Sequence, residues 1–120
     1  MTIKQLIKKC HKLAIEKGFW DKTCWWCGGI SKEDIKRCSC NNNIFIPRNK
    51  SELLMLIVSE LGEACEALRN NNDRNFKEEI ADTFIRLADL CGGLGIDIEK
   101  EIIKKIKKNK KRPYKHGKEF

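Results

Sequence analysis

Apolar side chains recur at intervals of three, four and seven residues along most of this 120-residue chain. Such spacing places them on one face of an α-helix, which must then pack against another element. The stretches that show it are residues 2–17, 50–69, 75–91 and 97 to about 109. Residues 20–48 show no lasting period. We therefore predict an all-α fold in a single domain over residues 1–120: a four-helix bundle with an insertion at 20–48, between its first two helices.

The expected ends of these helices follow from residues with strong local preferences. The candidate N-cap residues of the first, second and fourth helices are Thr2, Asn49 and Asp97. The run Asn70-Asn71-Asn72-Asp73 predicts a turn before the third helix. That helix is expected to break near residue 91, at Gly92, Gly93 and Gly95. Pro113 should end the fourth helix and leave an extended tail at 114–120.

The charge of the chain is unevenly distributed. The net charge of +8 divides into +7 over residues 1–50, −6 over 51–100 and +7 over 101–120. An acidic centre can hold cations, and basic flanks can approach phosphates, so one uniformly basic surface for nucleic acid is not favoured. No apolar run approaches the ~20 residues that span a membrane. The N-terminus also lacks the apolar core of a secretory signal. We therefore expect a soluble, cytoplasmic protein with no membrane partner.

Four carboxylates lie in two pairs on the second and third helices. The pairs are Glu60 with Glu63, and Glu79 with Asp82, each at i, i+3 spacing beside an apolar stripe. Two helices joined by a short turn pack antiparallel, so the pairs can face each other. Four converging carboxylates would repel one another unless a cation neutralised them, and oxygen ligands favour Mg²⁺ or Mn²⁺. The alternative is that each is a solvated surface acid.

Seven cysteines are many for this length, and four of them cluster in the aperiodic segment. These four are Cys24, Cys27, Cys38 and Cys40. Two closely spaced pairs can surround one tetrahedral Zn²⁺ as a closed structural site, which would order the segment. Loose or redox-active thiols and an iron–sulfur cluster are the alternatives. The remaining cysteines, Cys10, Cys65 and Cys91, occupy helical positions where small buried apolar residues are expected.

The acidic motifs carry a family resemblance. The segments Glu60-Leu-Gly-Glu63-Ala-Cys-Glu66 and Glu78-Glu79-Ile-Ala-Asp82-Thr-Phe-Ile-Arg86 resemble those of the MazG-type nucleotide pyrophosphohydrolases, in the all-α NTP pyrophosphatase superfamily. The basic C-terminal segment and Lys17-Gly18-Phe19-Trp20-Asp21 fit as well. The resemblance covers about 2–22 and 49–120 but not the cysteine-rich insertion.

This resemblance implies a function. Glu60, Glu63, Glu79 and Asp82 would bind Mg²⁺. The enzyme would cleave a nucleoside triphosphate between its α and β phosphates, giving a monophosphate and pyrophosphate. A carboxylate not fully used by the metal, which we take to be Glu63, would accept the proton from water. The resemblance also implies a homo-oligomer, either a dimer or a tetramer. The preferred base and sugar cannot be read from these motifs.

Further residues are candidates for holding the substrate. Phosphates would contact Lys105, Asn109, Arg112 and Arg86, although a solvated lysine-rich face, and for Arg86 a carboxylate partner, are the alternatives. Trp20 would stack on a base or, alternatively, close the core. His116 is a weaker candidate in the tail.

A rival function is a zinc-containing nucleic-acid-binding module on an inactive bundle. The insertion carries Trp25, Trp26, Lys32, Lys36 and Arg37, which suit a lid over the active site, an oligomer contact or a nucleic-acid contact. The four intact acids favour the enzyme over this rival.

Overall fold

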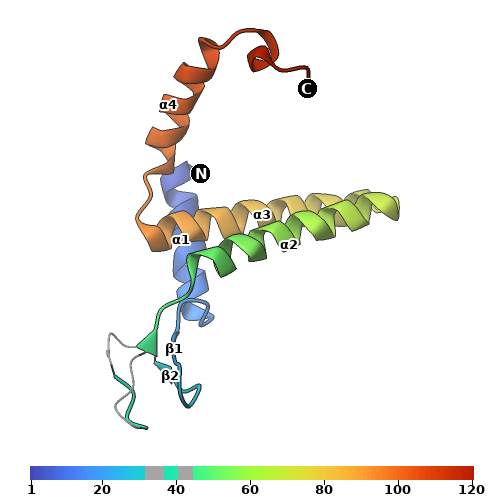
Figure 1. The fold of residues 1–120 in the computed structure, drawn as a ribbon. Coiled ribbons are helices and arrows are strands. Elements are labelled where there is room, and N and C mark those ends of the chain that lie inside the picture. The colour runs from blue at the N-terminus through green and yellow to red at the C-terminus, as the bar shows by residue number, and fades with distance from the viewer. Residues whose placement is uncertain (32–36, 41–44) are drawn as a thin grey trace.

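The computed structural model describes residues 1–31, 37–40 and 45–120, so the candidate contacts Lys32 and Lys36 lie outside the described residues. The elements in chain order are α1 (Ile3–Glu16), β1 (Lys22–Cys24), β2 (Ile30–Ser31), β3 (Phe45–Ile46), α2 (Lys50–Arg69), α3 (Asp73–Leu94), α4 (Ile98–Lys110) and the short 3₁₀ helix η1 (Tyr114–Gly117). Figure 1 shows this arrangement. The predicted all-α class, with an insertion between the first two helices, is confirmed.

The predicted N-caps form as expected. The side chain of Thr2 accepts a hydrogen bond from the backbone N–H of Gln5, at 3.2 Å. Those of Asn49 and Asp97 accept from Ser51 and Lys100, at 2.8 and 3.2 Å. Each bond satisfies a backbone donor that has no partner within its own helix.

Helices α2 and α3 form a long antiparallel hairpin (Figure 1). The turn between them is shorter than predicted. Asn72 caps α3 by accepting a hydrogen bond from the backbone N–H of Asn75, at 3.1 Å, so the helix already begins at Asp73. Small side chains are buried on both helices, Ala64 and Ala67 on α2 and Ala88 on α3. Close approach of the two helices over this length fixes which of their side chains face each other.

The prediction that the third helix breaks at Gly92 and Gly93 is wrong, whereas Gly95 ends the helix as predicted. Helix α3 continues through Gly92 and Gly93 and ends at Leu94, where Gly95 takes the left-handed conformation with φ 65°. The two earlier glycines allow a close approach instead. A Cβ atom on Gly92 would lie 2.7 Å from Cβ of His11, and one on Gly93 would lie 2.1 Å from the indole ring of Trp20. Helix α1 and the residues after it therefore pack directly on the backbone of α3.

We expect Gly93→Ala to lower the free energy of unfolding by about 1–3 kcal/mol, because the added methyl group would overlap the Trp20 ring. Helix propensity alone would favour alanine by about 1 kcal/mol. Gly62→Ala is the matched control, since a Cβ at Gly62 in α2 would meet nothing within 4 Å. Chemical denaturation of both variants is the measurement. Equal gains in stability would show that the indole does not rest on Gly93.

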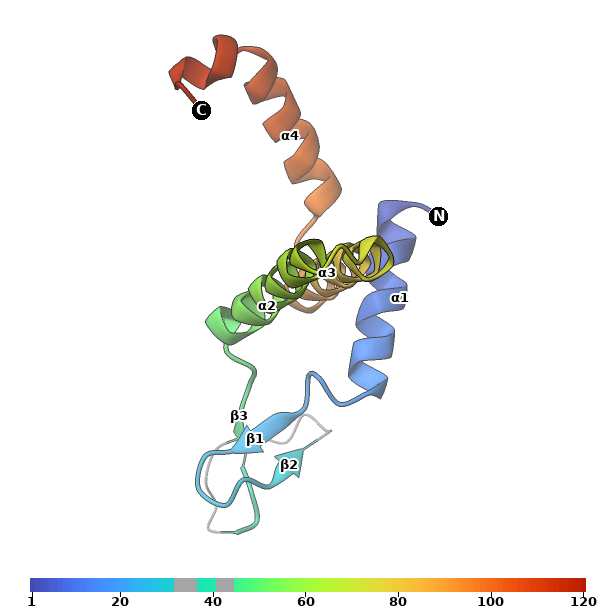
Figure 2. The same ribbon diagram turned by 90° about the vertical axis from the view of Figure 1, so that its right-hand side faces the viewer.

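The cysteine-rich module, residues 20–48, contains a small antiparallel sheet in the order β2-β1-β3 (Figure 2). Thr23 pairs with Ile46, and Cys24 pairs with Phe45. Because β1 follows α1 and β3 precedes α2, this pairing ties the end of α1 to the start of α2. The segment that looks aperiodic in sequence thus has backbone pairing at its base.

Helix α4 stands apart from the other three helices (Figures 1 and 2). Helices α1 and α2 both pack on α3, whereas the apolar side of α4, with Ile102, Ile103 and Ile106, is exposed. The predicted extended tail is wrong, because residues 114–117 form a tight 3₁₀ turn. This turn is closed by a bond from the N–H of His116 to the Pro113 carbonyl, at 2.8 Å, and by a 2.8 Å contact between Arg112 Nη1 and His116 Nδ1. Within the described residues, no helix is long and apolar enough to cross a membrane.

Candidate functional site

Three of the four predicted carboxylates converge in the α2–α3 seam. One carboxylate oxygen from each of Glu60, Glu79 and Asp82 lies within 4.8 Å of the others, and we call these residues the acidic triad. Glu60 comes from α2, and the other two come from one face of α3. Solvent exposure increases across the triad: Glu60 is 8% exposed, Glu79 is half-buried and Asp82 is exposed. An oxygen-only cluster open on one side is the kind of site that Mg²⁺ occupies while it keeps water or phosphate ligands.

The fourth predicted carboxylate, Glu63, lies beside the triad and outside it. It is exposed, one turn along α2 from Glu60. With Glu79 it borders a separate hollow of about 210 Å³ toward the α2–α3 turn. It still contributes to the electrostatics of the cluster, since its charge is among the causes that raise the pKa of Glu79.

The pKa values of the triad move in opposite directions. Burial acts to raise the pKa of Glu60, but the net change is a lowering, because Arg86 on α3 forms an ion pair and a hydrogen bond with this carboxylate. Burial raises the pKa of Glu79, and the charges of Glu63 and Glu60 raise it further. The single guanidinium therefore compensates Glu60 but leaves Glu79 among like charges. A bound cation would relieve that repulsion.

A cavity of about 290 Å³ begins at the triad and extends toward α1; we call it the central cavity. Its polar end contains Glu60, Asp82 and Arg86. Its apolar walls come from α1, α2 and α3, and include Leu13, Ala14, Leu53, Leu56 and Ile85. A volume near 300 Å³ is at the small end of the range for ligand pockets. Carboxylates at one end and apolar walls at the other suit a ligand that has an apolar ring and a head group that is cationic or bound to a cation.

Comparison with known protein families shows to which family this chain belongs. The family model described as MazG-like matches residues 50–120, more than half of the chain. The chain belongs to the MazG-like family. The match starts at the first residue of α2 and includes the whole acidic triad, whereas α1 and the cysteine-rich module precede it. At the level of the family, this membership indicates nucleotide pyrophosphohydrolase chemistry. Among curated proteins and among solved structures, no match is found.

Asp89, in the MazG-like segment, lines the central cavity although the sequence analysis does not single it out. This residue lies two helical turns along α3 from Asp82. Its Oδ1 accepts a hydrogen bond from the indole N–H of Trp20, at 2.7 Å, and lies 2.8 Å from Nδ1 of His11. The interval of seven from Asp82 placed it on the same helical face, and that was the available signal.

The contacts of Trp20 match the alternative that it closes the core. Its ring lies against Gly93 and meets His11 edge to face, with 5.2 Å between the ring centroids. It is not among the residues that line the central cavity. Arg86 is likewise tied to a carboxylate, that of Glu60, while it also lines the cavity.

The four clustered cysteines converge, as predicted. All four sulfurs lie within 4.8 Å of one another, with 3.7 Å between Cys24 and Cys40 and 3.7 Å between Cys27 and Cys38. A disulfide would require about 2.05 Å. A tetrahedral zinc ion with Zn–S bonds of about 2.3 Å places its sulfurs about 3.8 Å apart. This four-cysteine cluster therefore has the spacing of a tetrahedral thiolate site.

The backbone around the four-cysteine cluster also favours thiolates. The N–H of Cys27 points at the sulfur of Cys24 and, against the effect of burial, lowers the pKa of that thiol to about 7. The N–H of Gly29 donates to the sulfur of Cys27, at 3.3 Å. Burial raises the pKa of Cys40 to about 12, with the neighbouring cysteines adding to the effect. Four thiolates in one place thus require a cation.

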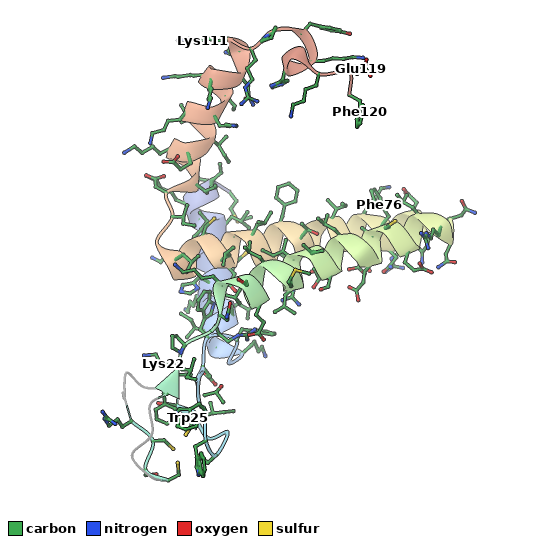
Figure 3. The ribbon with its side chains drawn as sticks, viewed as in Figure 1. Lys22, Trp25, Phe76, Lys111, Glu119 and Phe120 are labelled. Carbon is green, nitrogen blue, oxygen red and sulfur yellow. The ribbon has the colours of Figure 1, made fainter. Side chains whose placement is uncertain are left out.

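The remaining candidates fall elsewhere. Lys105 and Asn109 are exposed on α4, and Arg112 is exposed two residues after the end of that helix. None of the three lines the central cavity of the same chain. Figure 3 shows Lys111, at the end of α4, far from the cysteine-rich module that carries Trp25. His116 contacts Arg112 within the tail. Of the three other cysteines, Cys91 is buried and Cys10 is half-buried, but Cys65 is exposed, so its predicted burial is wrong.

Proposed function

We propose that this MazG-like protein is a Mg²⁺-dependent nucleoside triphosphate pyrophosphohydrolase, with Mn²⁺ as the alternative metal. It would cleave the substrate between the α and β phosphates and release a nucleoside monophosphate and pyrophosphate. The observation that supports this most directly is the acidic triad at one end of the central cavity, with apolar walls leading away from it.

The residues of the site fit divalent magnesium. The donors are carboxylate oxygens, and they are graded from buried to exposed. Burial and the charges of Glu63 and Glu60 raise the pKa of Glu79, and a cation would offset both effects. Glu60, Glu79 and Asp82 would hold the metal, with Glu63 beside them. When bound, Mg²⁺ supplies neutralisation of phosphate charge and a lower pKa for an attacking water.

The residues of the chain have distinct tasks in this proposal. Arg86 fixes the carboxylate of Glu60 through their ion pair. Glu63, which is exposed and stands outside the triad, accepts the proton of the attacking water. The apolar walls at Leu13, Leu53 and Leu56 receive the nucleoside and keep water from it.

We also propose that the working form is a homo-oligomer, a dimer or a tetramer. Lys105, Asn109 and Arg112 would then bind phosphates of a substrate held by another copy, because they do not border the cavity of their own chain. Large apolar side chains remain exposed on the hairpin and on α4, among them Leu54, Val58, Phe84 and Ile103. A second copy would cover such a surface.

The test is incubation of the protein with each common NTP and dNTP and Mg²⁺, with detection of both pyrophosphate and the monophosphate. We expect equal amounts of both products from at least one nucleotide and none when Mg²⁺ is chelated. Release of inorganic phosphate would assign the cleavage to another bond. No hydrolysis, together with tight and salt-sensitive binding to nucleic acid, would support the rival binding function instead.

For the four-cysteine cluster we propose a structural Zn²⁺ held by Cys24, Cys27, Cys38 and Cys40. The support is the sulfur spacing of a tetrahedral site and the backbone N–H groups directed at two of the sulfurs. Four thiolates leave no position open for water, so this metal would fold the module and take no part in hydrolysis.

A further inference from the structure

Asp89 of α3 is held by two aromatic side chains that contact the same carboxylate oxygen. Its Oδ1 accepts a hydrogen bond from the indole N–H of Trp20, at 2.7 Å, and lies 2.8 Å from Nδ1 of His11. Because an ionised carboxylate only accepts hydrogen bonds, Nδ1 of His11 must carry a proton and donate as well. Two donors on one oxygen fix the rotation of the carboxylate and the oxygen that faces them.

The second oxygen of Asp89 has no such contact. Within the described part of the chain, both contacts of this carboxylate end on Oδ1, and none is made by Oδ2. The side chain is 18% exposed. Oδ2 is also open to solvent, because Arg48 Nε is the only buried side-chain polar atom without a partner among the described residues that are not exposed. Asp89 borders the central cavity and not the neighbouring hollow that His11 lines, so Oδ2 offers an acceptor to a ligand in the central cavity.

The place of Asp89 along the cavity indicates which part of a nucleotide it would meet. The residues of α3 that line the cavity are Asp82, Ile85, Arg86 and Asp89. Asp89 is the last of them, about 10 Å along the helix axis from Asp82 at 1.5 Å per residue. When the phosphates of a nucleotide are held at the acidic triad, its sugar hydroxyls lie near them, and the exocyclic group on the base edge lies furthest away. The base edge is therefore the part that reaches Asp89.

Bases differ in the exocyclic group that they present at this edge. Cytosine and adenine carry an amino group, which donates hydrogen bonds, whereas uracil and hypoxanthine carry a carbonyl oxygen at the same position, which only accepts. A carboxylate oxygen can accept from the amino group but repels the carbonyl oxygen. We propose that Asp89 is a specificity residue that accepts a hydrogen bond from the exocyclic amino group of the base and thereby selects cytosine or adenine nucleotides. This inference rests on the proposed function.

Asp89→Asn tests this role because it reverses the polarity of the atom that faces the ligand. The N–H groups of Trp20 and His11 require an oxygen at the position of Oδ1, so the asparagine amide must place its NH₂ group at the position of Oδ2. The size of the side chain is unchanged, and an acceptor becomes a donor. The variant should therefore favour bases with a carbonyl group, the reverse of wild type.

The experiment measures kcat/KM of wild type and Asp89→Asn with three pairs of nucleotides: CTP and UTP, dCTP and dUTP, and ATP and ITP. We expect wild type to prefer the amino member of each pair that it accepts by about tenfold to a hundredfold, the factor for one hydrogen bond to a charged group. The preference should reverse in Asp89→Asn. Inhibition by inorganic tripolyphosphate should be equal in the two proteins, because that ligand has no base.

The matched control is Asp73→Asn. Asp73 is exposed at the start of α3, where it pairs with Lys77 at 2.6 Å, so its variant should keep the wild-type preference. A wild type that prefers the carbonyl member, or an unchanged preference in Asp89→Asn, would overturn the proposal. An equal loss with every nucleotide, together with weaker tripolyphosphate inhibition, would reduce Asp89 to a support for Trp20 and His11.

Two further outcomes separate the inference from its neighbours. A change confined to the ratio of ribonucleotides to deoxyribonucleotides would place a sugar hydroxyl at Oδ2 and overturn the contact with the base. Wild type that hydrolyses no nucleotide would refute the proposed function and this inference with it, whereas an active wild type with an unchanged preference in Asp89→Asn would refute the role of Asp89 alone.

Discussion

Glu79→Gln should abolish turnover and at the same time stabilise the metal-free protein. A metal site supplies several kcal/mol of transition-state stabilisation, so removing one ligand charge should lower kcat/KM by about 10²–10³-fold. The stability change has the opposite sign, because burial and the like charges of Glu63 and Glu60 disfavour the ionised Glu79, whereas glutamine is neutral. A residue with a purely structural role would not combine these two effects.

The pH dependence follows from the raised pKa of Glu79. An acid whose pKa is higher in the folded than in the unfolded state leaves the protein most stable when it is protonated. That stability is fully present below the ordinary value of 4.5 and is lost as the pH rises through the folded-state pKa. At pH 7, metal-free Glu79→Gln should therefore melt above wild type, and below about pH 4.5 the two should melt together. Added Mg²⁺ should raise the melting temperature of wild type only.

Glu78→Gln is the control for this prediction. Glu78 is the neighbour of Glu79 in sequence, but it is exposed and paired with Arg74 on the surface of α3. Its variant should keep both the activity and the Mg²⁺ response of wild type. If Glu79→Gln retained activity, the triad would not be the metal site. If it melted like wild type at pH 7 without metal, the carboxylates would not repel one another as their positions require.

The acidic triad shows how far local spacing carries a prediction. An i, i+3 pair on each of two antiparallel helices was enough to place Glu60, Glu79 and Asp82 in one seam. It placed Glu63 only beside them, exposed but close enough for its charge to raise the pKa of Glu79. Two residues three apart are separated by about 60° around a helix. Which of them faces the partner therefore depends on the rotation and crossing of the helices, and these are set by packing of residues such as Ala64 and Ala67.

The glycines of α3 show a different limit. A local preference assigns Gly92 and Gly93 to the end of a helix, yet both are helical because Trp20 and His11 occupy the space where side chains would be. Tertiary packing overrides the local tendency here. Asp89 and Arg48, whose guanidinium donates to the Phe19 carbonyl, also escaped prediction, because their partners lie far away in sequence: Trp20 for the first and Phe19 for the second. Spacing indicates the helical face of Asp89, but the long-range contacts themselves leave no periodic signal.

Removal of zinc should unfold the cysteine-rich module and leave the α2–α3 hairpin folded. Structural zinc supplies about 10–16 kcal/mol to small zinc domains, and the strands of this module have only two or three residues each. The metal-free module should therefore lose the backbone bonds between Cys24 and Gly29, at 2.8 Å, and between Gly28 and Cys24, at 3.0 Å. Hydrogen exchange of these amides, before and after a strong zinc chelator, measures the change.

Elemental analysis provides the first readout, with one zinc per chain expected. Cys38→Ser should lose the metal, whereas Cys65→Ser, which replaces an exposed cysteine outside the cluster, should keep it. One iron per chain in place of zinc would change the identity of the metal but not the role of the four thiolates. A protein that contains neither metal, and whose module amides remain protected, would contradict the assignment.

The same loss of metal should reach the central cavity. Unfolding of the module releases the β1–β3 pairing that holds the end of α1 near the start of α2, and with it the contact between Arg48 and the Phe19 carbonyl. We therefore expect the chelated enzyme, returned to saturating Mg²⁺, to bind its nucleotide more weakly, while the acidic triad on α2 and α3 keeps its geometry. KM should rise, with kcat nearly unchanged. An unchanged KM after chelation would show that the module does not act on the cavity.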